Sequence, residues 1–330
     1  MKFFTNKSRV IAFSILSIVY LGTTSCFDDH IDFAQMKGIN YFCRHSILTP
    51  QEITFDNSAG IADAVLNKGD IVNIEPNTFV NSDGTAFDGK VYFTVVESPS
   101  RGFMAMNSVP TVSNGASLQS EGADLLRATD ATGHDLKIAS GHSIDFTMKG
   151  KATQYQNKMY YGDDDVADPR PNNTVLFNWV EASSDTVESY WNATESVYFY
   201  KLKPEQLGWI ACSRSNVVSN TTSVKVRVWG VHPINYNNTA VYLVPKVGHS
   251  AYRLWNYDES SNTFSGDENY ISNGSQFYVV VLALGKHEKM YFAKEEFTAG
   301  TNTEVKTITA VEGPSSGGFL NSVATQLLYL

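Results

Sequence analysis

Cysteine and histidine are too sparse and too scattered in this sequence to form a recognisable metal site. The chain of 330 residues has three cysteines and seven histidines, with no C-x-x-C pair and no H-E-x-x-H pattern. Structural zinc sites and zinc hydrolases need such closely spaced ligands. We therefore predict no metal, no cofactor and no metal-dependent catalysis.

Basic charge is also scarce. Lys and Arg number 25 against 34 Asp and Glu, and charged residues make up only 18% of the chain. Nucleic-acid-binding proteins carry basic patches, so this balance argues against a nucleic-acid partner. It equally argues against binding of the folded part to anionic lipid.

The N-terminus has the parts of a secretion signal. Three basic residues lie between Lys2 and Arg9, and residues 10–21 form an apolar run shorter than the ~20 residues of a membrane-spanning helix. Small residues then lead to Cys26, a pattern that predicts a lipoprotein signal peptide over residues 1–25 and acylation of Cys26. The alternatives are an ordinary cleavage site with a chance cysteine, or an anchor that is never cut.

Asp28 and Asp29 follow the predicted lipidation site. This acidic pair resembles the export signal that sends lipoproteins of Bacteroidota to the outer face of the outer membrane. It predicts a lipid-anchored outer-membrane protein at the cell surface, attached to the membrane through Cys26. A solvated spacer and a periplasmic location are the alternatives. Residues 26–50 show no sustained period and are interpreted as a tether.

The rest of the chain has the composition of a secreted β-protein. It holds 17 Tyr and 19 Phe, and its short apolar runs alternate with Asn, Asp, Gly and Ser. This texture predicts an all-β fold of two antiparallel Greek-key β-sandwiches in tandem, with a short C-terminal helix. The expected parts are a first sandwich over 51–150, an irregular connecting region over 151–220, a second sandwich over 221–312 and a tail over 313–330.

Some strands and turns are expected more specifically. Residues 277–284 are an unbroken apolar run, which predicts a central strand of the second sandwich buried on both faces. Asn81 to Gly84 is a turn signal, because glycine readily adopts positive φ. Phe319, Val323 and Leu327 lie four residues apart, as in an amphipathic helix. Further strands are expected at 70–75, 91–96, 125–129, 136–139, 144–148, 175–180, 197–202, 224–229, 241–244, 252–255, 290–293 and 305–311.

Glycine, proline and apolar residues of the first predicted sandwich follow a familiar pattern. The stretch from Gly69 to Phe79, with later positions such as Gly122 and Leu136, resembles the first domain of uncharacterised Bacteroidota surface lipoproteins. That domain is similar to the transthyretin-like module of carboxypeptidase regulatory regions. Residues 207–212 also resemble the segment before the second sandwich of those proteins. The resemblance implies architecture and location, and it carries over no catalytic residue.

Two motifs resemble a catalytic nucleophile and a calcium site, but the residues around them do not support either interpretation. Gly313 to Gly317 matches the G-x-S-x-G nucleophile pattern, but no histidine follows it, as that hydrolase fold requires. A hinge is the simpler interpretation, and we predict no enzymatic activity. Asp163 to Asp168 offers oxygen ligands for calcium but lacks EF-hand spacing, so a solvated loop is the simpler interpretation there.

Tryptophan and cysteine supply the remaining candidates. Trp191 lies in a polar stretch and Trp255 where a loop begins, and both are possible ligand-binding residues because sugar faces stack on aromatic rings. Cys43 and Cys212 lie beside aromatic residues. They are either joined by a disulfide or, in the simpler interpretation, two separate buried thiols.

These observations favour a binding function over catalysis. We expect a lipid-anchored cell-envelope protein that acts in adhesion or in envelope and surface assembly through a protein partner. The alternative is a glycan-binding accessory lipoprotein of a polysaccharide-uptake system, with Trp191 or Trp255 as the stacking platform.

Overall fold

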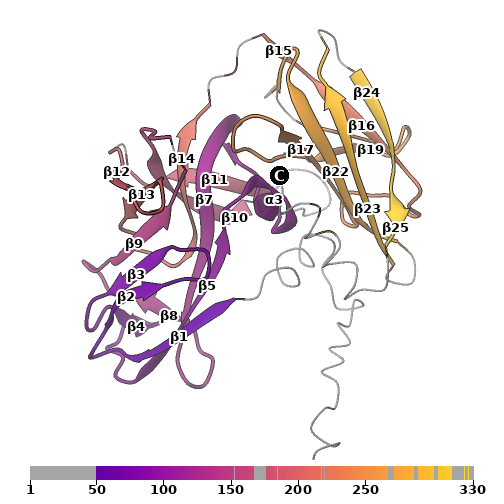
Figure 1. Cartoon of the computed structure of the whole chain (residues 1–330). Helices are drawn as coiled ribbons and strands as arrows, with labels where there is room; N and C mark the ends of the chain where they lie inside the picture. The colour runs from indigo at the N-terminus through magenta and orange to yellow at the C-terminus, as the bar shows by residue number, and fades with distance from the viewer. Residues whose placement is uncertain are drawn as a thin grey trace, which may run out of the picture. The chain divides into compact units, whose positions relative to one another are not determined.

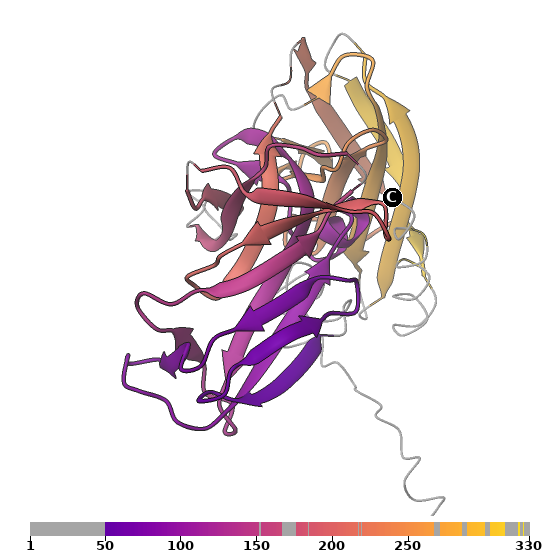
Figure 2. The ribbon, with the colours of Figure 1, turned by 60° about the vertical axis from the view of Figure 1, so that its left-hand side comes forward.

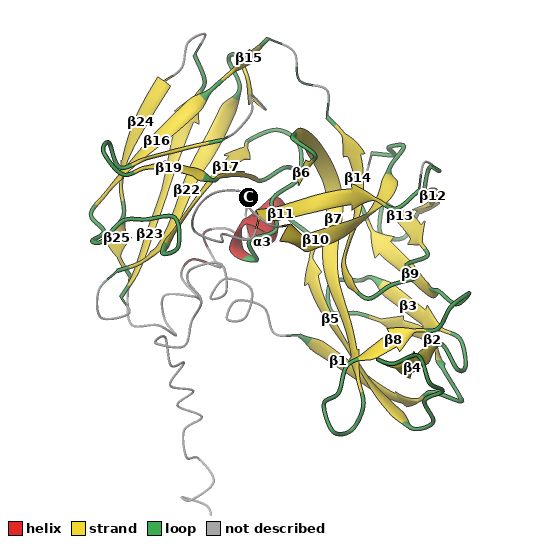
Figure 3. Cartoon of the chain, turned by 180° about the vertical axis from the view of Figure 1, so that it is seen from behind, coloured by secondary structure: helices red, strands yellow, loops and turns green. Residues whose placement is uncertain are grey.

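The computed structural model describes residues 50–151, 153–166, 176–183, 185–216, 218, 220–266, 271–285, 289–300, 304–313, 323 and 326. Strands make up most of this part of the chain, and α3 (Arg101–Met106) is its one helix with assigned ends (Figure 3). Within the same ranges, no helix has the length and hydropathy needed to cross a membrane. The predicted all-β character is confirmed.

The N-terminal module, residues 51–216, is built from two antiparallel sheets and a two-stranded ribbon (Figure 1). The larger sheet has the order β1-β5-β7-β14-β10-β11, with β6 beside β7. Its strands are β1 (Gln51–Asp56), β5 (Lys90–Ser98), β6 (Val112–Ser113), β7 (Ala116–Thr129), β10 (Lys158–Val166), β11 (Leu176–Glu181) and β14 (Gly208–Ser215). The smaller sheet has the order β12-β13-β9-β3-β2, with β2 (Ile61–Val65), β3 (Ile71–Ile74), β9 (Ile144–Lys149), β12 (Glu188–Asn192) and β13 (Val197–Leu202). The ribbon pairs β4 (Phe79–Asn81) with β8 (Leu136–Ile138).

One hydrophobic core fills the space between these two sheets. Phe93 and Leu126 enter it from the larger sheet, and Phe146 and Tyr200 enter it from the smaller one. All four side chains are fully buried. Because successive side chains of a strand point to opposite faces, strands such as β5 and β9 give every second residue to this core. These strands run from indigo to salmon in Figure 2.

Residues 151–220 are not the irregular connection that we expected. β10, β11 and β14 extend the larger sheet, and β12 and β13 extend the smaller one. The acidic run from Asp163 to Asp168 is typical of a loop. In the structure, however, β10 continues into this run as far as Val166. The N-terminal module therefore continues well past Gly150, where we expected its end.

The C-terminal module, residues 220–313, also has two main sheets around one core. The first has the order β19-β20-β16-β24, with β16 (Val224–Trp229), β19 (Asn256–Asp258), β20 (Thr263–Ser265) and β24 (Glu304–Thr309). The second has the order β18-β17-β22-β23-β25, with β17 (Thr239–Pro245), β18 (Tyr252–Leu254), β22 (Gln276–Leu284), β23 (Met290–Thr298) and β25 (Val311–Glu312). β15 (Thr221–Thr222) pairs with β21 (Ile271–Ser272). β16 and β24 run parallel, so the first sheet is mixed where we expected an antiparallel one.

β22 is the central strand of its sheet, as predicted. It lies between β17 and β23, and its residues Val279 to Ala283 are almost completely inaccessible to solvent. Val279 and Val281 belong to the core of the C-terminal module. Val280, on the opposite face, is buried as well. An unbroken apolar run is what a strand covered on both faces requires.

Backbone hydrogen bonds join the two modules near α3. The Thr111 N–H donates to the Ala251 carbonyl at 2.8 Å, and the Ser120 N–H donates to the His249 carbonyl at 3.0 Å. α3 packs between β5 and β17, and all its residues except Arg101 are buried. These contacts cover backbone and side chains that an isolated module would expose.

Local interactions at the opposite end of the N-terminal module fix its turns. The buried side chain of Asn57 donates to the carbonyls of Phe79 and Phe87 at 2.9 Å each and accepts the Phe79 N–H at 3.1 Å. Gly84 has φ of +88° and donates its N–H to the Asn81 carbonyl, which confirms the predicted turn.

The predicted C-terminal helix stays a prediction. Only Val323 and Gln326 of the tail after Gly313 are described, and Phe319 and Leu327 lie outside the described residues.

Candidate binding site

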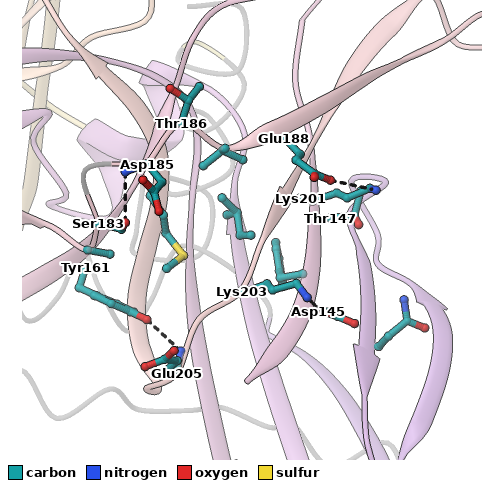
Figure 4. A pocket seen from close by; sticks show the side chains of 16 residues that line it. Asp145, Thr147, Tyr161, Ser183, Asp185, Thr186, Glu188, Lys201, Lys203 and Glu205 are labelled. Atoms are coloured by element: carbon teal, nitrogen blue, oxygen red, sulfur yellow. Dashed lines mark hydrogen bonds and ion pairs between the residues drawn. The ribbon is translucent and has the colours of Figure 1, made fainter. Parts of the chain in front are cut away.

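An open cleft of about 710 Å³ lies where the chain passes from β11 to β12 (Figure 4). Residues 182, 183 and 185–188 form one wall, and the rest comes from β3, β9, β10, β13 and the residues that follow β13. Its lining comprises Asn73, Asp145, Phe146, Thr147, Met159, Tyr161, Ala182, Ser183, Asp185, Thr186, Val187, Glu188, Lys201, Leu202, Lys203 and Glu205. Apolar side chains and charged or hydroxyl groups both face this space, as in sites that bind amphipathic ligands.

Charges inside the cleft are partly paired. Lys201 lies 3.3 Å from Glu188, and Lys203 lies 3.6 Å from Asp145 (Figure 4). All four side chains are more than half exposed, so these ion pairs are weak and can rearrange around a ligand. The carboxylate of Asp185 has no ion-pair partner in the described part of the chain.

Tyr161 is held in a fixed position at one end of the cleft. The Glu205 N–H donates to the Tyr161 hydroxyl oxygen at 2.9 Å (Figure 4). Burial raises the pKa of Tyr161, so the phenol remains protonated at neutral pH and can donate its proton to a ligand oxygen. The cleft therefore offers both hydrogen-bond donors and acceptors to a ligand.

Beside the cleft, β12 carries two exposed aromatic side chains. Trp191 is 45% exposed, and its ring centroid lies 5.0 Å from that of Tyr198. Tyr190, 41% exposed, stacks on Phe199 at 5.5 Å with an interplanar angle of 12°. Adjacent residues of a strand point to opposite faces, so the two rings lie on opposite faces of β12. We call this strand, with its two rings, the β12 edge.

The β12 edge differs from the opposite edge of its sheet. Among the described residues, β12 pairs with β13 alone, and the register is continuous from Glu188 to Asn192. At the other edge, the pairing of β2 shifts between Ile61 and Ala64, and Asp63 has a positive φ of 51°. Irregularities of this kind protect an edge from pairing with another chain. The described residues of β12 show no such irregularity.

The two tryptophans proposed from the sequence have different surroundings. Trp191 is accessible at the β12 edge. Trp255 is only partly exposed, and the guanidinium of Arg253 lies 4.2 Å from its ring centroid, where it covers one face of the ring. β12 contains Trp191 and also Glu188, which lines the cleft. Trp255 belongs to the C-terminal module.

Tyr190 and the cleft residues were missed from the sequence. Tyr190 stands next to Trp191 in a polar segment, and the pair of rings was the available signal. Lys203 and Glu205 gave no signal, because surface lysine and glutamate are common in any β-protein. Of the other three tryptophans, Trp179 and Trp209 are buried and Trp229 is 50% exposed.

A cluster of buried carboxyl groups closes one end of the N-terminal core. Asp70, Glu97 and Asp124 are at most 8% exposed. Asp70 accepts the Lys149 N–H at 2.7 Å, and Asp124 accepts the Ser98 N–H at 3.1 Å. Burial raises the pKa of Asp70 to about 7 and raises the pKa of Asp124 well above its usual range, to which the neighbouring Asp70 adds. Burial of two adjoining carboxyl groups therefore favours their protonated forms.

Cys212 is a free thiol in the same buried region. It is completely inaccessible to solvent, and burial raises the pKa of its thiol well above the usual range. Cys43 lies outside the described residues, so its state stays a prediction.

Several predicted sites fall on residues that the structure does not describe. Cys26, Asp28 and Asp29 lie outside the described residues, as does part of the acidic run from Asp163 to Asp168. Within the described ranges, no group of three or more His, Cys, Asp or Glu side chains is arranged to hold a metal ion.

Comparisons with known proteins give no family for this chain. No protein-family model matches it, and no curated protein sequence matches it.

Proposed function

We propose that this protein is a lipid-anchored component of the cell envelope that binds a protein partner in adhesion or surface assembly, without catalysis. The observation that carries the proposal is the β12 edge, a strand of regular register with Tyr190 and Trp191 exposed on it. Tryptophan and tyrosine dominate the binding energy of protein interfaces. A rigid sheet that presents them needs little reorganisation on binding.

The location in the cell rests on the sequence. The leader up to Leu21 and the residues from Cys26 to Asp29 support acylation of Cys26 and display on the outer face of the outer membrane. Two separate hydrophobic cores support the finer architecture that we propose, two Greek-key sandwiches in tandem. The resemblance to Bacteroidota surface lipoproteins supports the same location.

Glycan binding is the second candidate, and the cleft beside Trp191 favours it. Hydroxyl and carboxylate groups such as those of Thr186 and Asp185 are suited to sugar hydroxyls, and Trp191 is suited to a sugar ring. In that case the protein would be an accessory lipoprotein of polysaccharide uptake.

The test compares two tryptophans of similar exposure, Trp191 and Trp229. Cells carrying Trp191→Ala should lose attachment to partner cells or assembly of surface protein, whereas cells carrying Trp229→Ala should behave as wild type. The purified protein is also applied to a glycan array. Glycan binding that depends on Trp191 would replace the proposed function by the second candidate, and equal behaviour of both variants would refute the role of the β12 edge.

A further inference from the structure

The backbone of β12 has hydrogen-bonding groups directed away from its sheet. On the neighbouring strand β13, the Tyr198 N–H donates to the Lys151 carbonyl, and the Tyr198 carbonyl accepts the Gly150 N–H, each at 2.8 Å. Tyr198 therefore uses both groups on the side away from β12. In an antiparallel pair, residues alternate between hydrogen-bonded and non-hydrogen-bonded partners.

This alternation identifies the free groups of β12. Trp191 is opposite Tyr198, and Ser189 is opposite Tyr200, so both occupy non-hydrogen-bonded positions. Their N–H and C=O groups point to the open side of the strand. Val187 lies two residues before Ser189, so its main-chain groups also point away from β13. Its N–H donates to the Asn157 carbonyl. Among the described residues, the outward main-chain groups of this edge therefore have no main-chain partner after Val187.

The chain segment that forms this edge carries charge of one sign, and the lysines near it lie on neighbouring strands. Residues 182–196 contain three carboxylates, those of Asp185, Glu188 and Glu195, and no Lys or Arg. Glu188 and Glu195 have lysine partners on the adjoining strands, and Asp185 adds a charge without such a partner in the described part. A second copy of this chain would bring the same carboxylates to the contact, and the chain has a net charge of −9. A basic segment would instead be attracted.

We propose that the β12 edge binds an extended, basic segment of a protein partner, which adds to the sheet as a further strand. The segment pairs its backbone with Ser189 and Trp191 and places alternate side chains against the rings of Trp191 on one face and Tyr190 on the other. Main-chain hydrogen bonds supply affinity in this mode, and the rings and charges supply specificity. The inference rests on the proposed function and specifies the kind of partner.

The experiment uses a synthetic peptide of alternating lysine and valine as the probe, with binding to the full chain followed by fluorescence anisotropy. Ser189→Pro removes the outward N–H without removing a hydrogen bond to β13. Ser189→Ala is the matched control, because both variants lose the hydroxyl that accepts a hydrogen bond from Gln154. Equal melting temperatures of the two variants show that the fold is intact.

We expect Ser189→Pro to weaken peptide binding roughly threefold to tenfold relative to Ser189→Ala, the effect of one net hydrogen bond. A peptide methylated on alternate backbone nitrogens should bind more weakly than its parent, and a glutamate–valine peptide should not bind. Absence of binding, equal binding by both Ser189 variants, or equal binding of the acidic peptide would overturn the inference. Because the attachment test with Trp191→Ala is separate, loss of attachment together with any of these results would retain the proposed function and reject strand addition.

Discussion

Replacement of Asp70 by asparagine should change how the stability of the N-terminal module depends on pH. Burial raises the pKa of Asp70 from 3.8 to about 7, and the pKa of the adjoining Asp124 carboxyl is also raised by burial. The folded protein therefore keeps a proton that the unfolded chain releases between these two pH values. The stabilisation is complete below pH 3.8 and is lost as the pH rises to about 7.

The size of this effect follows from the shift. One pKa unit corresponds to about 1.4 kcal/mol, so the free energy of unfolding of the wild type should contain a loss of about 4 kcal/mol across the window. The asparagine of the Asp70→Asn variant would have no proton to lose, and its side-chain oxygen can still accept the Lys149 N–H, which lies 2.7 Å from the Asp70 carboxylate in the wild type. The difference in unfolding free energy between wild type and Asp70→Asn should therefore shift in favour of the variant as the pH rises.

Urea unfolding at a series of pH values from below 3.8 to above 7 measures this difference. Burial, with help from Lys151, lowers the pKa of His249 to about 4, and this contribution has the opposite sign. It cancels in the comparison because both proteins contain His249. Asp56→Asn, an exposed substitution on β1, is the control and should follow the wild type. Parallel curves for wild type and Asp70→Asn would refute the raised pKa of Asp70.

Three further predictions concern packing and the buried thiol. Asn57→Ala should lower the free energy of unfolding by about 3 kcal/mol, because backbone groups of β4 lose buried partners. Substitution of the exposed Asn67 by alanine should have little effect. Equal losses of stability in the two variants would contradict this prediction. Val281→Ala should cost about 2 kcal/mol in urea unfolding and Val247→Ala, at a side chain 87% exposed, almost nothing. The thiol of Cys212 should react with a thiol reagent only after denaturation, and rapid labelling of the folded protein would show that it is not buried.

Strands with continuous or alternating apolar residues could be predicted from the sequence. β22 is apolar throughout and is central, and Val224, Val226 and Val228 alternate along β16 as a half-buried strand requires. Burial decides both patterns: β22 is buried on both faces, and β16 on one. The spacing of apolar residues in the sequence therefore predicts which faces of these strands are buried.

Other strands could not be predicted because polar groups interrupt their pattern. β7 extends over Ala116–Thr129, but only its last five residues were expected, since Glu121 and Asp124 are charged residues inside the fold. Glu121 is paired there with Arg214 at 3.3 Å, and Asp124 belongs to the buried carboxyl cluster. Such long-range partners leave no local signal.

The candidate site could be predicted only in part. Trp191 was expected as a ligand-binding residue, but β12 itself was not expected as a strand, because its five residues are mostly polar or partly exposed. The rings of β12 pack against β13 and not into the main core. Pairing with β13, which only the folded sheet creates, places Tyr190 and Trp191 at an edge.

Site-specific photocrosslinking on intact cells tests the central claim most directly. A photoreactive phenylalanine analogue replaces Tyr190 in one strain and Trp229 in another, two positions of comparable exposure in different modules. The account predicts a protease-sensitive crosslinked product from position 190 and none from position 229. No product at position 190, or equal products at both positions, would contradict a protein partner at the β12 edge.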